Sequence, residues 1–290
     1  MVRNIIMMLS VSLPLMITSA EAQDNNIFTA ALDGLNGVIE DYPKPWPLNN
    51  LVKPGVLTVA MSGDNPPADF VDKSTGNLTG FVHELYLQLG TDLGLEVEFV
   101  RISFSGQLPG LKANRFDMAC SGAGWTTQRL GSQDFFLTSP IAINGSLGLT
   151  RKDTGIAGWD DVEGKRLVGA SGEISLEHGK SLPIGSVIEV PGQPEALLAL
   201  VNRQADFIVN NIGSILFMQK NAPNKDDLVV FGPLMKPYAQ GLCVNPAEPD
   251  LLQAVNVLLG NYRARGYLRE LYEKYDAPVE VVDLLKTFGY

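Results

Sequence analysis

The stretch from Asp117 to Arg129, which reads DMACSGAGWTTQR, combines small residues, hydroxyl groups and one arginine in a way that suits an anionic ligand. Its first three residues resemble the end of a buried strand, and residues 121–124 are too small and flexible for a strand interior. Thr126 can cap a helix that carries Arg129. Such a strand–loop–helix turn exposes backbone N–H groups, and a guanidinium matches a carboxylate in two-point contact. We therefore predict a carboxylate-binding pocket, with an ordinary turn and a solvent-facing Arg129 as the alternative.

The elements before this stretch predict an open parallel sheet. Residues 57–61 read as a strand, and a helix follows from Phe81 with apolar residues four apart, closed by Gly94. A further strand and a short helix lead to the central stretch. Alternating strands and helices favour a parallel sheet covered on both faces, with ligands at the carboxyl ends of its strands. The turn at 62–67 and the loop at 121–124 both follow strands, so we expect them to meet at one edge.

The second half of the chain repeats the pattern. Strands at 165–170 and 207–209 end in small or polar residues and lead into helices. Their ends offer Ser171, Glu173 and Asn211, together with Asn210, as further site candidates. The length of 290 residues suits two domains of ordinary size.

The N-terminus and the composition indicate an exported protein. An apolar run from Ile5 to Ile17 and the small-residue site at 20–22 predict a signal peptide over residues 1–22. No later segment is long and apolar enough to span a bilayer, so we expect a soluble periplasmic protein. The 22 basic and 32 acidic residues give a net charge of −10, which argues against nucleic acid as a partner. No residues are spaced like a metal site, and we expect no metal and no other cofactor.

Six motifs, in this order and with these gaps, resemble the periplasmic solute-binding proteins that deliver polar amino acids to ABC importers, often called solute-binding family 3. The resemblance covers roughly residues 55 to 275. The motifs are GDNPP at 63–67, GFVHEL at 80–85, LPGLKANRFDMACSGAGWTTQR at 108–129, DFFLTSP at 134–140, WDDVEGKRLVGASGE at 159–173 and NRQADFIVNN at 202–211.

The resemblance implies an α/β fold of two lobes, the type II periplasmic binding protein fold. Each lobe is an open, mostly parallel sheet flanked by helices, and two hinge strands join the lobes. After an N-terminal extension at 23–50, lobe one comprises residues 51–141 and 242–290, and lobe two comprises residues 145–237. We expect crossings near 141–146 and 238–243, and a short tail after Asp276 that packs back on the body.

The function implied is that of the substrate-binding component of an ABC transporter. Such a monomer captures a small carboxylate-bearing solute (an amino acid, an amino-acid derivative or a related organic acid) by lobe closure and delivers it to a permease in the inner membrane. By position, Arg129 grips the ligand carboxylate, helped by the Gly124 N–H and by Ser175 or Ser171. The residues expected to contact the ligand are Arg129, Ser121, Gly122, Gly124, Thr126, Ser62, Asp64, Asn65, Phe104, Ser171, Glu173, Ser175 and Asn211.

Two departures from the family pattern concern the ligand's ammonium group. The family usually has a hydroxyl residue where this chain has Gly124, and an aspartate where it has Asn211. A charge-assisted contact is about twice as strong as a neutral one, so this loss weakens the ammonium site. The ligand is then either a carboxylate without a simple α-amine, or an amine held by Asp64 or Glu173.

Other functions stay open at this level. Cyclohexadienyl dehydratases resemble the same family, but their catalytic glutamate follows a strand end where this chain has Asn210 and Asn211, which disfavours an enzyme. A ligand-sensing partner of a membrane receptor or of a periplasmic enzyme is a third possibility. Cys120 and Cys243 can be free and buried or bonded; we favour free cysteines, because neighbouring strand positions often miss disulfide geometry.

Overall fold

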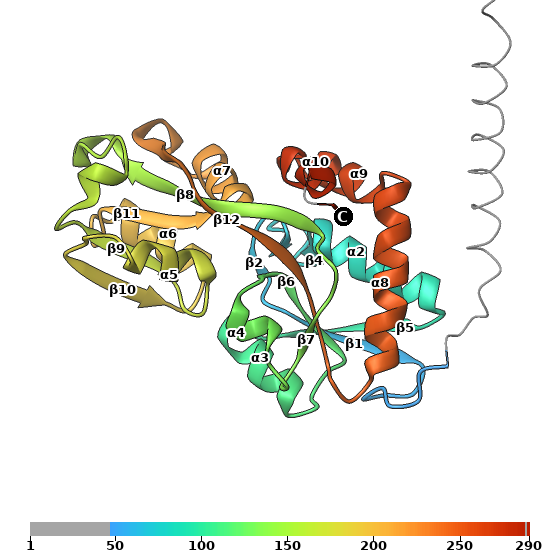
Figure 1. The fold of residues 1–290 in the computed structure, drawn as a ribbon. Coiled ribbons are helices and arrows are strands. Elements are labelled where there is room, and N and C mark those ends of the chain that lie inside the picture. Colours follow the sequence, from blue (N-terminus) through green and yellow to red (C-terminus); the bar gives the residue numbers. More distant parts are fainter. Residues whose placement is uncertain (1–46, 288) are drawn as a thin grey trace, which may run out of the picture. The chain divides into compact units, whose positions relative to one another are not determined.

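The computed structural model describes residues 47–287 and 289–290 (Figure 1). The predicted signal peptide and the extension up to residue 46 lie outside the described residues. Most strands belong to a nine-stranded sheet of order β10-β9-β11-β8-β12-β6-β1-β5, in which β7 also pairs with β12. Hydrophobic side chains form separate core clusters at its two ends, as expected for a two-lobed α/β protein.

Lobe one is built on three parallel strands, β5, β1 and β6; β12 pairs antiparallel with β6, and β7 pairs antiparallel with β12. The helix predicted from Phe81 ends at Gly94 in the left-handed conformation, and its apolar residues are buried against the sheet. A small three-stranded sheet lies beside it. The elements of this lobe are β1 (Val56–Met61), β2 (Asp64–Asn65), β3 (Asp69–Val71), β4 (Leu78–Thr79), α2 (Phe81–Leu93), β5 (Glu96–Arg101), α3 (Phe104–Lys112), β6 (Met118–Gly124), α4 (Thr127–Leu130), β7 (Phe136–Leu137), α8 (Pro249–Ala264), α9 (Tyr267–Lys274) and α10 (Glu280–Thr287).

Lobe two repeats the arrangement with a parallel core of β10, β9 and β11. Helices α5 and α6 contact β9 and β11, and α7 contacts β8. The elements are β9 (Arg166–Ala170), α5 (Ile174–Lys180), β10 (Ser186–Val190), α6 (Gln193–Val201), β11 (Phe207–Asn211) and α7 (Ile212–Asn221), with short 3-10 turns at Lys152–Thr154, Trp159–Val162 and Lys225–Asp227.

Two long strands connect the lobes. β8 (Ala142–Arg151) and β12 (Leu228–Val244) run antiparallel to each other and carry the sheet from one lobe into the next. Residues 228–244 form a single strand of 17 residues. Register shifts between Phe231 and Tyr238 let it bend without losing its partner. The exact lobe boundaries remain a prediction.

The loop predicted at residues 121–124 is also strand. β6 continues to Gly124 because β12 pairs with it there, with Gln240 opposite Gly124. The small residues instead allow an irregular backbone, since Cys120 and Gly122 both have positive φ. A Cβ at Gly122 would lie 2.6 Å from the Gln240 amide, so glycine is needed where the two strands come close.

The cysteine prediction was wrong. Cys120 and Cys243 form a disulfide, with their Cα atoms 5.6 Å apart on β6 and β12. The β-bulge between Gly241 and Cys243 changes the pairing at this point, so ordinary strand geometry does not apply.

The C-terminal tail folds back as predicted. Val281, Val282 and Leu285 of α10 are buried in the larger core cluster of lobe one. The same helix packs against strand β8. The end of the chain therefore lies beside one of the two connections between the lobes.

Candidate binding site

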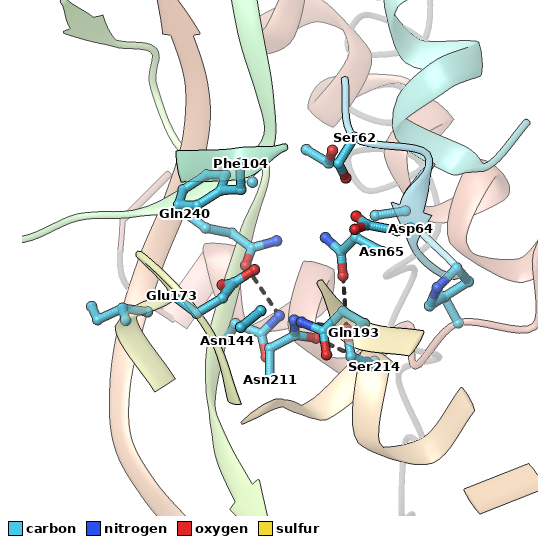
Figure 2. A pocket seen from close by; sticks show the side chains of 18 of the residues that line it. Ser62, Asp64, Asn65, Phe104, Asn144, Glu173, Gln193, Asn211, Ser214 and Gln240 are labelled. Carbon is cyan, nitrogen blue, oxygen red and sulfur yellow. Dashed lines mark hydrogen bonds between the residues drawn. The ribbon is translucent and has the colours of Figure 1, made fainter. Parts of the chain in front are cut away.

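A cavity lined by residues of both lobes lies where the predicted strand ends meet (Figure 2). Counted as space open to the centre of a water molecule, it measures about 40 Å³, against the roughly 10–15 Å³ that one water needs. It therefore suits a small solute. Its lining includes Ser62, Asp64, Asn65, Pro67, Phe81, Phe104, Ser121, Gly122, Asn144, Glu173, Ile174, Gly192, Gln193, Asn211, Ser214, Tyr238, Gln240, Tyr272, Pro278 and Val281.

The structure brings eight of the thirteen predicted site residues to this cavity and places five elsewhere. The eight are Ser62, Asp64, Asn65, Phe104, Ser121, Gly122, Glu173 and Asn211. The five that do not line it are Gly124, Thr126, Arg129, Ser171 and Ser175.

Arg129 lies beside the cavity and is engaged by the protein itself. Its Nη1 donates to the Gly124 carbonyl at 3.1 Å, and its Nη2 donates across the lobes to the Gly172 carbonyl at 2.9 Å. The guanidinium lies 5.7 Å from the centre of the Phe104 ring, at the distance of a cation–π contact. Burial lowers the pKa of Arg129, while nearby Glu173 opposes that shift.

The other four displaced residues have structural contacts. Thr126 caps α4 by accepting from the Arg129 N–H at 3.1 Å. The Gly124 position is enclosed by Ile174 and Tyr238, whose side-chain atoms would lie 3.0 Å from a Cβ placed there. Ser175 is buried and bonds Ser146 at 3.0 Å. The pKa of Glu189 is lowered chiefly by its hydrogen bond with Lys180, and Ser171 contributes a further hydrogen bond.

Asp69 organises the first wall of the cavity from behind. This fully buried carboxylate accepts hydrogen bonds from Ser121 Oγ at 2.6 Å, from the Gly63 N–H at 2.7 Å and from Ser62 Oγ at 3.1 Å. Burial nevertheless raises the pKa of Asp69 to about 6, and neighbouring Asp64 adds to the effect. The hydroxyl groups of Ser62 and Ser121 thus donate their hydrogen bonds to Asp69, so only their oxygen lone pairs remain for a ligand.

Two carboxylates line the cavity from opposite lobes. Glu173 precedes α5 in lobe two, and burial raises its pKa to about 7, more than the attraction of Arg129 lowers it. The like charges of Asp64 and Asp69 raise the pKa further. Burial also raises the pKa of Asp64, which lies close to Gly192 at the start of α6 in lobe two. Both acids therefore favour a cation beside them.

Asn211 lines the cavity, but its amide is already engaged. Its Oδ1 caps α7 by accepting from the Ser214 N–H at 2.9 Å, and its Nδ2 donates to Ser214 Oγ at 2.9 Å. That hydroxyl donates in turn to Asn65 Oδ1 of lobe one at 2.9 Å, so the network joins the two lobes (Figure 2).

Several lining residues were missed by sequence reasoning. Asn144 and Gln240 lie on the connecting strands and bond each other at 3.1 Å. Gln193 is the first residue of α6 and follows the end of β10. A polar residue between a strand end and a helix also identified Asn211, so the sequence does carry a signal for Gln193. Pro278 and Val281 belong to the tail, whose sequence carries no sign of a site.

Within residues 47–287 and 289–290, no three His, Cys, Asp or Glu side chains are grouped so that they could hold a metal ion. The helices in this part of the chain are too short or too polar to cross a membrane.

Comparisons with known proteins agree on one family. Residues 57–277 match the bacterial extracellular solute-binding proteins, family 3. The L-cystine-binding protein TcyA of Bacillus subtilis is 26% identical over 228 residues, which cover 78% of this chain and 83% of TcyA.

Solved structures are similar as well. Holo ArgBP from T. maritima superposes with a TM-score of 0.66 at 28% identity, covering 77% of this chain and 96% of ArgBP. An ancestral amino-acid-binding protein, described as a precursor of cyclohexadienyl dehydratase, gives 0.69 at 28% identity, covering 76% and 95%. The chain described here belongs to the bacterial extracellular solute-binding proteins of family 3.

Proposed function

We propose that this protein is the periplasmic substrate-binding component of an ABC importer for a small solute of the amino-acid class. The observation that carries the proposal is a small polar cavity enclosed by both lobes of a family 3 fold. L-Cystine and arginine are named for two of the similar proteins, which supports a solute of this class.

Lobe closure over the ligand is the mechanism we propose for recognition by the permease. The contacts between the lobes include hydrogen bonds from Ser214 to Asn65 and from Arg129 to Gly172, an ion pair between Lys220 and Asp276, and the ring pair Phe70–Phe217. A ligand that touches both walls of the cavity adds to these contacts and shifts the population toward the closed form.

Thermal-shift screening of amino acids, their derivatives, amines and organic acids tests the proposal, followed by calorimetry of each hit. A ligand raises the melting temperature by mass action and reduces the radius of gyration in small-angle scattering. Absence of any stabilising small molecule across these classes would refute a binding function. A hit with an unchanged radius of gyration would refute closure alone.

A dehydratase-like enzyme is the second candidate, and Glu173 is the observation that favours it. A cavity carboxyl group with a pKa of about 7 has the properties of a general acid. We nevertheless propose that the protein is not an enzyme, because no glutamate follows Asn210 and Asn211 at the strand end where the dehydratases have theirs. Nuclear magnetic resonance of each hit during prolonged incubation decides between them, since an enzyme converts its ligand.

A further inference from the structure

Several polar groups on the cavity lining present acceptors to a ligand. Ser62 and Ser121 donate to Asp69, and the amides of Asn144 and Asn211 are engaged in the protein. Glu173 and Asp64 add two acidic side chains to the lining. A ligand therefore has to bring donors, and preferably positive charge.

Two buried groups that can donate also remain on the lining, the Gln193 amide and the Tyr272 hydroxyl. Gln193 is 3% exposed and lines the cavity, and its Nε2 has no hydrogen-bond partner among the described residues. Its Oε1 accepts from Asn210, which orients the amide, and the group faces Glu173 closely enough to lower the pKa of that carboxyl. An unpaired buried donor indicates a ligand acceptor beside the carboxylate.

The cation expected to bind a ligand carboxylate is partly engaged by the protein in this arrangement. Both terminal nitrogens of Arg129 donate to backbone carbonyls, and Arg129 is not part of the lining. Ile174 and Tyr238 line the cavity and also fill the space around Gly124, the other half of the expected clamp.

The two cavity carboxylates come from different lobes. Asp64 lies on β2 and Glu173 immediately before α5, and they are close enough for the charge of Asp64 to raise the pKa of Glu173. Closure of the empty protein therefore brings like charges together in a buried place, which opposes closure. A cation bound between Asp64 and Glu173 is attracted to both carboxylates, so the same two charges then favour closure.

We propose that the cavity recognises its ligand through a positively charged amine held between Glu173 and Asp64, and that a carboxylate on the ligand is not required. The inference rests on the proposed function, because it names the ligand group on which lobe closure depends. The Gln193 Nε2 donates a hydrogen bond to a hydroxyl or carbonyl oxygen of the ligand next to its amine. The aromatic side chains of Phe81, Phe104, Tyr238 and Tyr272 are part of the lining and exclude water.

Matched probes separate the amine from the carboxylate. Serine, glutamine and histidine carry both groups; ethanolamine, 4-aminobutanamide and histamine lack the carboxylate; the N-acetyl amino acids lack the charged amine. We expect calorimetry at neutral pH to detect binding of at least one amino acid and of its decarboxylated partner, within about tenfold in Kd, and none of the N-acetyl form. Binding of an N-acetyl form without its amine partner would overturn the proposal, as would the failure of every amine-bearing probe at millimolar concentration.

Charge-removing variants locate the interaction. Glu173→Gln keeps the shape and is expected to weaken amine binding about 30-fold or more, as for loss of one member of a buried charge pair. Asp64→Asn should act in the same direction. Glu177→Gln is the matched control, because this exposed residue of α5 pairs with Lys180. Unchanged amine affinity in Glu173→Gln would refute the assignment. If N-acetyl acids bind and close the lobes, the solute-binding function stands and this inference alone fails.

Discussion

Replacing Glu173 by glutamine should stabilise the ligand-free protein at alkaline pH while impairing its function. A carboxyl group whose pKa is raised by folding contributes stability below its ordinary pKa and loses it as pH rises through the folded value. For Glu173 these values are 4.5 and about 7, so the loss takes place between them. Glutamine does not ionise, so the variant keeps its stability as the pH rises through this range.

The magnitude follows from the same values. A rise from 4.5 to about 7 corresponds to about 3 kcal/mol, at 1.36 kcal/mol for each pH unit. Because the side chain keeps some exposure toward the cavity, we expect the variant to gain about 1–3 kcal/mol at pH 8 relative to pH 4.5. The charges that set the balance are Arg129, which favours ionisation, and Asp64 and Asp69, which oppose it.

Urea unfolding of the ligand-free proteins at both pH values measures this difference. Wild type and the Glu177→Gln control are treated in parallel, so that contributions of other groups cancel. If Glu173→Gln changes the free energy of unfolding equally at pH 8 and pH 4.5, Glu173 ionises without cost and the electrostatic account of the cavity is wrong.

Three further predictions follow from the site and the core. The affinity for amines should fall as the pH drops below about 7, by up to tenfold per pH unit, because protonated Glu173 must lose its proton before it can bind a cation. Calorimetry at pH 8 and about pH 6 measures this change. A Kd that does not depend on pH would contradict the prediction. Arg129→Ala should weaken the binding of amine probes about tenfold or less through loss of the hydrogen bond to Gly172, without changing the preference for amines over N-acetyl acids. If the variant instead lost the binding of carboxylate ligands selectively, Arg129 would be a carboxylate clamp after all. Replacing both Cys120 and Cys243 by alanine should cost about 2–4 kcal/mol, since the disulfide spans 123 residues; urea unfolding with and without reductant measures it, and identical curves would show no contribution.

The fold could be predicted because its signals are local. The helix Phe81–Leu93 was correct at both ends, since apolar residues recur every four positions and Gly94 can adopt the left-handed conformation. Strand ends followed by small polar residues located the edge where the cavity forms. These features require only the neighbouring sequence.

The features that failed depend on pairing between distant segments. Gly124 continues a strand only because Gln240 lies opposite it, and the disulfide forms because the two strands shift register beside it. Neither partner can be read from the stretch around Ser121. The contribution of Pro278 and Val281 to the cavity likewise depends on where the tail folds back.

Arg129 shows why a motif position does not determine a role. The residues around it decide what its guanidinium can reach: Gly124 provides a carbonyl, Ile174 and Tyr238 fill the neighbouring space, and Glu173 supplies the nearby negative charge. With these neighbours the arginine joins the lobes and partly balances a protein carboxylate. The excess of negative charge in the cavity then has to be met by the ligand. In the mechanism that we propose, charge balance rather than a single anchoring residue connects ligand identity to lobe closure.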